Sequence, residues 1–345
     1  MTVVGRRHAG DGRTGSRVET ARWAGRRARC FRYELVVWLA RADAWEAGLC
    51  GWTCRPRLLL VTRRGWVARV NEVTGEGLVF DGEAEQGETA GAVFARWPDG
   101  RAGVLTRSTV DAARARQTAE VLVMARAAGV PVPRHERVLD FADGVVLVVQ
   151  ERLVGAPAAA VDERVVDAVI AVNERFAGLL AGRPDVPLAA PDAAPALDWG
   201  EALEHHSPRS RRLRRRLAPL TGAWTGRADD LVHPDLTTPN VLFDADGGVS
   251  GVVDWNGGAF RGDRRAALVK LLFDSTWDAA CPGGFERVRP EALERLEEHV
   301  RGSLDADRLR QLWAWYAVTM ADWTIRSRDP VGIEVHLALG EREFG

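Results

Sequence analysis

Three short apolar runs separated by turn residues open the regular part of the chain. Residues 77–80, 92–97 and 102–107 each have the length and composition of a strand. Between the second and third runs, Pro98-Asp99-Gly100 is a strong turn signal, because proline presets φ and glycine tolerates positive φ. The pattern therefore predicts three consecutive strands.

A helix and a further strand follow these runs. Asp111 is suited to cap a helix that runs to about Ala128, where Gly129 ends it. Residues 145–149 form an apolar run typical of a buried strand. Together these elements predict a small β-rich lobe, which we assign to residues 73–153.

The remainder of the chain, residues 154–345, has mostly helical periodicity. Apolar spacing predicts helices over residues 266–277, 290–301 and 305–326. The same spacing predicts another helix through Val165, Val169, Val172, Phe176 and Leu179. Residues 183–198 are rich in Ala, Pro and Asp and predict a loop. The expected fold class is α+β, with a small β-rich N-terminal lobe and a larger, mostly helical C-terminal lobe.

Composition excludes several classes of partner. The 345 residues carry a net charge of −1, which provides no general attraction to nucleic acid or anionic membranes. No apolar run approaches the roughly 20 residues needed to span a bilayer. The four cysteines show no metal-ligand pairing with histidines, which indicates a reducing compartment. We therefore expect a cytoplasmic protein with no nucleic-acid or membrane partner.

Residues 1–72 differ from the rest of the chain. Within residues 1–70 there are 15 arginines and 5 acidic residues, so the remainder carries a net charge of about −11. The segment is interpreted as a poorly ordered extension, although a basic arm for an anionic partner is the alternative. Under the first interpretation, a protein that begins near Val73 keeps its stability and activity.

The strongest chemical signal lies between residues 231 and 254. Asp235 follows an apolar approach, Asn240 comes five residues later, and Asp254 ends the apolar run 249–253. Protein kinases have the same residue types in the same order, where one Asp accepts the proton of the attacking hydroxyl and an Asn and a second Asp hold Mg²⁺. Two unrelated β-turns are the alternative reading, because Asp and Asn are common in turns.

Three segments in this order resemble the aminoglycoside phosphotransferase/choline kinase-like family, which has a bilobal protein-kinase-like fold. They are the strands from Leu78 to Arg107, the stretch from Gly129 to Gly155, and the motif 233–240 with Val253-Asp254-Trp255. The resemblance implies that Asp235 is the catalytic base and that Asn240 and Asp254 bind Mg²⁺. His233 is expected to organise the loop by hydrogen bonding.

The resemblance also implies a nucleotide site in the N-terminal lobe. ATP or GTP would donate the phosphoryl group, and its base would meet the backbone near Gln150, Glu151 and Leu153. Thr89 and the backbone of the polar turn 85–91 would cradle the phosphates.

One departure from the family concerns the third strand, which normally carries a lysine that pairs with the nucleotide phosphates and with a helix Glu. Thr106 stands at that position here, and Arg107 follows it. Successive strand residues point to opposite faces, so Arg107 substitutes only if the register shifts or its side chain wraps round. Glu120 is the candidate helix partner. Lys270, the only lysine in the chain, falls in the other lobe.

Two functional hypotheses follow. The first is a phosphotransferase that moves the γ-phosphoryl group of ATP or GTP to a hydroxyl of a small-molecule acceptor. The second is a nucleotide-binding regulatory protein with weak or no transfer, because the lysine is missing. The acceptor stays open: Asp274 and Asp278 could face it or lie on the surface, and the six arginines within residues 209–216 could hold an anion or form a solvated helix face.

Overall fold

The computed structural model describes residues 63–84, 91–193, 200–221, 228–281 and 287–342. All of them lie in one unit that spans residues 32–345. Thr89, with the rest of the segment 85–90, and the arginine-rich segment before residue 63 lie outside the described residues.

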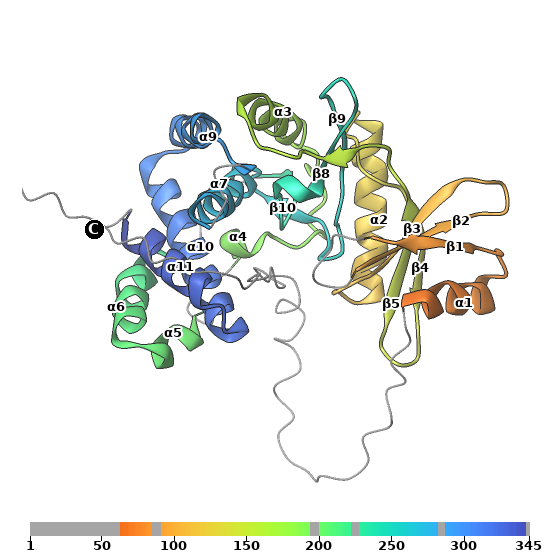
Figure 1. The fold of residues 1–345 in the computed structure, drawn as a ribbon, viewed down its shortest axis with the longest axis horizontal. Coiled ribbons are helices and arrows are strands. Elements are labelled where there is room, and N and C mark those ends of the chain that lie inside the picture. The colour runs from red at the N-terminus through yellow and green to blue at the C-terminus, as the bar shows by residue number, and fades with distance from the viewer. Residues whose placement is uncertain (1–62, 85–90, 194–199, 222–227, 282–286, 343–345) are drawn as a thin grey trace, which may run out of the picture. The chain divides into compact units, whose positions relative to one another are not determined.

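A five-stranded antiparallel sheet with the strand order β1-β2-β3-β5-β4 forms the first half of the described chain (Figure 1). Its strands are β1 (Val79–Glu83), β2 (Ala92–Arg96), β3 (Ala102–Arg107), β4 (His135–Asp140) and β5 (Val146–Glu151). The predicted strands are confirmed as β1, β2, β3 and β5, with small shifts at their ends. The mostly polar edge strand β4 has no counterpart in the sequence prediction, because it lacks a continuous apolar run.

Helix α1 (Arg63–Thr74) covers one face of this sheet. Its buried side chains Trp66, Val67 and Val70 belong to the same apolar cluster as Leu105 of β3. A boundary between residues 72 and 73 therefore falls inside a helix that shares the core of the sheet. The expected boundary is corrected accordingly: we infer that the sheet region begins at or before Arg63, and that a protein beginning near Val73 loses stability.

Two valines on α1 provide a matched test of this inference. Val70 is fully buried, whereas Val73 is 63% exposed. We expect Val70→Ala to lower the free energy of unfolding by about 2 kcal/mol, since two methyl groups leave a packed site. Val73→Ala should change it by less than about 0.5 kcal/mol. Urea unfolding of both variants checks this, and equal effects would contradict the assignment of α1 to the core.

Helix α2 (Ala112–Ala127) lies against the opposite face of the sheet. The Asp111 side chain caps it by accepting a hydrogen bond from the Arg114 backbone N–H, as the sequence predicted. Ala112 and Ala115 pack in one cluster with Val146 and Val148 of β5. Small residues on the helix therefore face the sheet.

The second half of the described chain is mostly helical (Figure 1). Its helices are α3 (Glu163–Glu174), α4 (Ala190–Ala193), α5 (Glu201–His206), α6 (Pro208–Leu217), α7 (Arg265–Ala280), α9 (Pro290–Ser303), α10 (Ala306–Ser327) and α11 (Pro330–Arg342). The helices predicted from apolar spacing are confirmed as α3, α7, α9 and α10, except that α3 ends at Glu174 and does not reach Phe176 and Leu179. The predicted loop 183–198 is wrong in part, because α4 forms within it, and α11 was not predicted. Among the described residues, no helix is long and apolar enough to cross a membrane.

Short strands and turns connect these helices near the predicted motifs. β6 (Ala156–Pro157), β8 (Val241–Phe243) and β9 (Val249–Val252) form one sheet, and β7 (Asp230–Val232) pairs with β10 (Phe260–Gly262). The expected fold class is confirmed: an antiparallel sheet region precedes a larger helical region.

The six arginines within residues 209–216 lie on α6. Several of their side chains pair with acidic residues of neighbouring helices. Arg209 binds Glu334 and Glu341, and Arg214 binds Glu204. Arg216 donates to the backbone carbonyl of Gly340. These contacts support a structural role for the arginines as against an anion-binding one.

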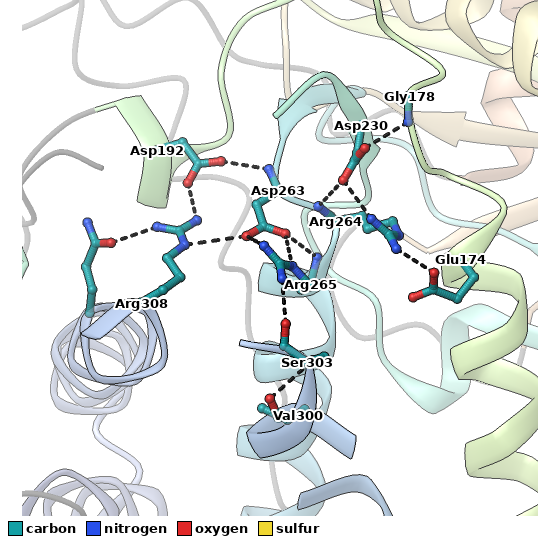
Figure 2. Close-up of polar contacts among 11 residues, drawn as sticks. Glu174, Gly178, Asp192, Asp230, Asp263, Arg264, Arg265, Val300, Ser303 and Arg308 are labelled. Carbon is teal, nitrogen blue, oxygen red and sulfur yellow. Dashed lines mark hydrogen bonds and ion pairs between the residues drawn. The ribbon is translucent and has the colours of Figure 1, made fainter. Parts of the chain in front are cut away.

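A buried ion network joins α4, α7 and α10 (Figure 2). Arg308 of α10 donates to Asp192 of α4, and its Nε lies 3.6 Å from Asp263, which stands between β10 and α7. Arg265 of α7 holds the other side of Asp263 at 2.8 Å. The side chains of Arg308, Asp192 and Asp263 are only 1–3% exposed. The network therefore fixes the start of α7 against the helical core.

Candidate active site

His233 organises the loop between β7 and η4 (Thr238–Asn240). Its Nε2 lies 2.9 Å from the carbonyl of Val253, and its Nδ1 accepts a hydrogen bond from the Asp235 backbone N–H at 3.1 Å. These partners require a proton on Nε2 and none on Nδ1. Burial lowers the pKa of His233 to about 4, so the ring is neutral. The histidine thus links the segment around Asp235 to the segment before Asp254, as expected.

The register of the β8–β9 hairpin brings Asp235, Asn240 and Asp254 together. Val241 pairs with Val252, and the Val253 N–H donates to the Asn240 carbonyl at 2.9 Å. Asn240 and Asp254 therefore stand at the same end of the hairpin. The Asn240 Nδ2 donates to the Asp235 carbonyl at 2.9 Å and lies 3.5 Å from its Oδ2. The three residues expected to carry the chemistry occupy one site.

Asp254 has a strained backbone and a perturbed carboxylate. Its φ of 65° is in the left-handed region, which non-glycine residues rarely adopt and which is often found at functional sites. Surrounding protein atoms and the Asp235 carboxylate raise its pKa, against a hydrogen bond from Asn256 Nδ2 at 2.6 Å.

The donor set at this end of the hairpin fits Mg²⁺. The Asn240 Nδ2 is engaged with Asp235, which leaves its Oδ1 as a hard oxygen donor alongside the carboxylate of Asp254. Mg²⁺ in nucleotide sites is held by one or two carboxylates, with phosphates and water completing the octahedron. The described residues contain no group of three or more His, Cys, Asp or Glu arranged for a metal. The residues thus suit a cation that arrives with a nucleotide.

The α2-facing side of β3 carries no cation where the family has its lysine. Thr106 pairs with Val148, so it shares the face that packs against α2. It is 6% exposed, and its hydroxyl has no hydrogen-bond partner among the described residues. Arg107 is exposed and on the opposite face, and the register of β3 does not shift on either side. A contribution from Arg107 therefore requires its side chain to wrap round the strand.

Glu120 is not the helix partner that the sequence suggested. Its side chain is 68% exposed and pairs with Arg183 at 3.3 Å. The α2 residues that face the sheet include Ala112 and Ala115. Among the described residues, Thr106 thus stands alone at the place of an expected ion pair. The direction of Glu120 could not be foreseen, because the rotation of α2 depends on tertiary packing.

Hydrogen bonds to neighbouring segments hold the end of β5 and the residues after it. Gln150 is buried, and the N–H groups of Glu151 and Arg152 donate to the carbonyls of Arg134 and Ala102. The Glu151 carboxylate binds Arg126 at 2.8 Å and so has a structural role. No backbone hydrogen bond from the Leu153 N–H is found among the described residues.

Backbone hydrogen bonds and side chains of α2 hold the loop that follows Asp254. Thr109 N donates to the Asn256 carbonyl at 3.1 Å, and Arg114 donates to the Ala259 carbonyl. The Ala259 N–H donates to Thr118 Oγ1 at 3.1 Å. The position of this loop is thus tied to α2 without the lysine–glutamate pair.

Lys270 of α7 is a site residue that sequence reasoning missed. Its Nζ lies 3.1 Å from Asp235 Oδ1 and also contacts Asp274, one helical turn later. Its status as the only lysine was the available signal, together with its i,i+4 spacing to Asp274. Asp274 therefore reaches the site through its contact with Lys270. Asp278 is 7% exposed, so the alternative that it lies on the protein surface is wrong.

Comparisons with known proteins agree with this geometry. Residues 83–302 match the model of the phosphotransferase enzyme family. No curated protein matches the sequence significantly. Among solved structures, the chain is similar to a thermostable mutant of aminoglycoside phosphotransferase APH(4)-Ia in ternary complex with ADP and hygromycin B. That likeness has a TM-score of 0.58 and 16% identity, and it covers 80% of this chain and 96% of the other.

A second similar structure is the amicoumacin kinase hAmiN in complex with AMP-PNP, Ca²⁺ and Ami. It has a TM-score of 0.53 and 14% identity, with coverage of 80% of this chain and 93% of the other. At these identities the structural likeness shows the fold, which is the kinase-like fold expected from the sequence. The family model covers well over half of the chain. The chain therefore belongs to the phosphotransferase enzyme family.

Proposed function

We propose that this protein transfers the γ-phosphoryl group of ATP or GTP to a hydroxyl group of a small molecule, with Asp235 as base. The observation that carries the proposal is the hydrogen-bonded unit of Asp235 and Asn240 at the end of the hairpin that also presents Asp254. It combines a carboxylate able to take a proton with two oxygen donors for a cation. The similar APH(4)-Ia structure contains ADP and hygromycin B, which supports a nucleotide and a small acceptor.

The reaction balances without any further reagent. The acceptor oxygen forms a bond to the γ-phosphorus as the bond to the β–γ bridging oxygen breaks, and the acceptor proton passes to the Asp235 carboxylate. The nucleoside diphosphate leaves. When bound through Asn240 and Asp254, Mg²⁺ would neutralise phosphate charge during transfer.

The nucleotide would lie at the end of β5 and against β3. The base would lie against the strand that ends at Gln150 and Glu151, with the Leu153 N–H as donor to its edge. Arg107 remains a proposed phosphate contact through its long side chain, and Thr89 remains a proposed phosphate donor. Glu120 has no part in this nucleotide site, because its carboxylate pairs with Arg183.

The second candidate function is nucleotide binding with weak transfer. It is favoured by one observation, the buried Thr106 on the side of β3 that faces α2. A family lysine at this place neutralises nucleotide phosphates, and its absence removes that charge from the transition state. The two candidates therefore differ in turnover and agree on nucleotide binding.

The experiment that separates them measures binding and turnover on the same preparation. AMP-PNP binding with Mg²⁺ is measured by calorimetry, and phosphate transfer from labelled ATP or GTP is measured with aminoglycosides, macrolides, amino alcohols and simple alcohols. We expect transfer to at least one acceptor and its loss in Asp254→Asn. Tight binding without transfer to any acceptor would favour the second candidate, and no binding would overturn both.

A further inference from the structure

Lys270 is buried behind the proposed base. Its side chain is 4% exposed, whereas that of Asp235 is 29% exposed. An acceptor can therefore approach the carboxylate of Asp235 but has little access to the ammonium group. Any effect of Lys270 on the reaction has to act through Asp235.

The surroundings of Lys270 keep it charged. Burial by itself would lower its pKa, but the carboxylates of Asp274 and Asp235 outweigh burial and raise it. A buried ammonium group without such partners would be very unfavourable. The lysine therefore bridges two carboxylates, one on its own helix and one on the catalytic loop.

Contacts with His233, Lys270 and Asn240 fix how Asp235 lies among the described residues. Its backbone N–H donates to His233, its Oδ1 accepts from Lys270 at 3.1 Å, and its Oδ2 lies 3.5 Å from the Nδ2 of Asn240. Of the two carboxylate oxygens, Lys270 holds Oδ1. The oxygen on the Asn240 side is thus the one directed toward the proposed cation and acceptor.

We propose that Lys270 is a positioning residue, which holds Oδ1 of Asp235, is itself anchored by Asp274, and so directs the other oxygen toward the acceptor hydroxyl. The inference rests on the proposed function, since it assigns Lys270 a part in that transfer. It places the only lysine of the chain at the acceptor end of the site and not at the nucleotide end. A misplaced catalytic group costs on the order of 10²-fold in rate.

The kinetic test uses Lys270→Met, which keeps the length of the side chain and removes the charge. This variant leaves the carboxylates of Asp235 and Asp274 without their cation. The second variant therefore combines Lys270→Met with Asp274→Asn, which restores the local net charge of the wild-type protein. Phosphate release from ATP with Mg²⁺ is measured first with water as acceptor, and then with any acceptor that the wild-type protein uses. We expect kcat to fall about 10- to 100-fold in both variants, with KM for ATP within about twofold.

Controls separate positioning from folding. Arg295→Met removes an exposed ion pair with Asp167 and should leave kcat unchanged. If the double variant has wild-type thermal stability and a kcat within threefold of wild type, Lys270 does not position the base and the inference is overturned. A wild-type protein that transfers phosphate to neither water nor any acceptor overturns the proposed function, and the inference with it.

A second readout does not depend on activity. Because Lys270 is the only lysine, protein labelled with ¹⁵N-lysine has a single side-chain ammonium signal. We expect this signal to shift in Asp235→Asn and to keep its position in Arg295→Met. An unchanged signal in Asp235→Asn would show that the lysine does not hold the base, even if the enzyme is active.

Discussion

Asp235→Asn is expected to lower kcat by roughly 10²- to 10⁴-fold, with the fold and nucleotide affinity retained. Asparagine has nearly the same shape as aspartate but cannot accept the proton of the attacking hydroxyl. Lys270 keeps its ion pair with Asp274 in this variant, so no buried cation is left without a partner. His233 still accepts the backbone N–H of residue 235, and the loop keeps its conformation.

The measurement is steady-state transfer from labelled ATP, with AMP-PNP affinity measured in parallel. Asp246→Asn is the matched control, because Asp246 is exposed on the turn between β8 and β9. We expect this control to keep wild-type kcat. A kcat for Asp235→Asn within about tenfold of wild type would show that another group takes the proton.

Arg308→Ala is expected to lower the free energy of unfolding by about 3–5 kcal/mol. The substitution removes the guanidinium between Asp192 and Asp263, whose side chains are 3% and 1% exposed (Figure 2). Arg265 still binds Asp263, so Asp192 is the carboxylate left buried without a cation. Burial already raises the pKa of Asp192 above its ordinary value, which shows how poorly this place tolerates a negative charge.

Arg310→Ala is the matched control on the same helix. Arg310 and its partner Asp307 are 54% and 87% exposed, so their ion pair should contribute less than about 1 kcal/mol. Urea unfolding of both variants gives the comparison. The double variant Arg308→Met with Asp192→Asn should regain most of the free energy of unfolding that Arg308→Ala loses. In this variant no buried charge is left without a partner. A loss for Arg308→Ala no larger than that for Arg310→Ala would contradict the buried network.

Local patterns in the sequence were sufficient to predict most elements and to select three polar residues that the structure brings close together. The cap at Asp111 and the apolar spacing of α7, α9 and α10 depend on near neighbours, and the structure has these elements. Asp235, Asn240 and Asp254 were identifiable because a hairpin of short strands fixes their proximity. Hydrogen bonds within about 20 residues of sequence complete that unit.

Elements whose stability depends on distant partners were missed or misjudged. The apolar face of α1 is recognisable only when it packs on β3, and β4 forms because β5 offers it an edge. Asp192 lies in a stretch with a loop-like composition, yet Arg308 binds it from 116 residues away. Glu120 was chosen from its position on a helix, although packing turns it toward Arg183.

The sequence by itself determined the fold class and the family, and it selected the candidate motif, because these depend on residue types at short spacing. Only the tertiary structure decided which charges meet. It placed Lys270 against Asp235 and left Thr106 buried on the α2 side of β3. The physical reason is that helix rotation and ion pairing depend on how segments far apart in the chain pack together. Once a charge is buried by that packing, it requires a partner of opposite charge.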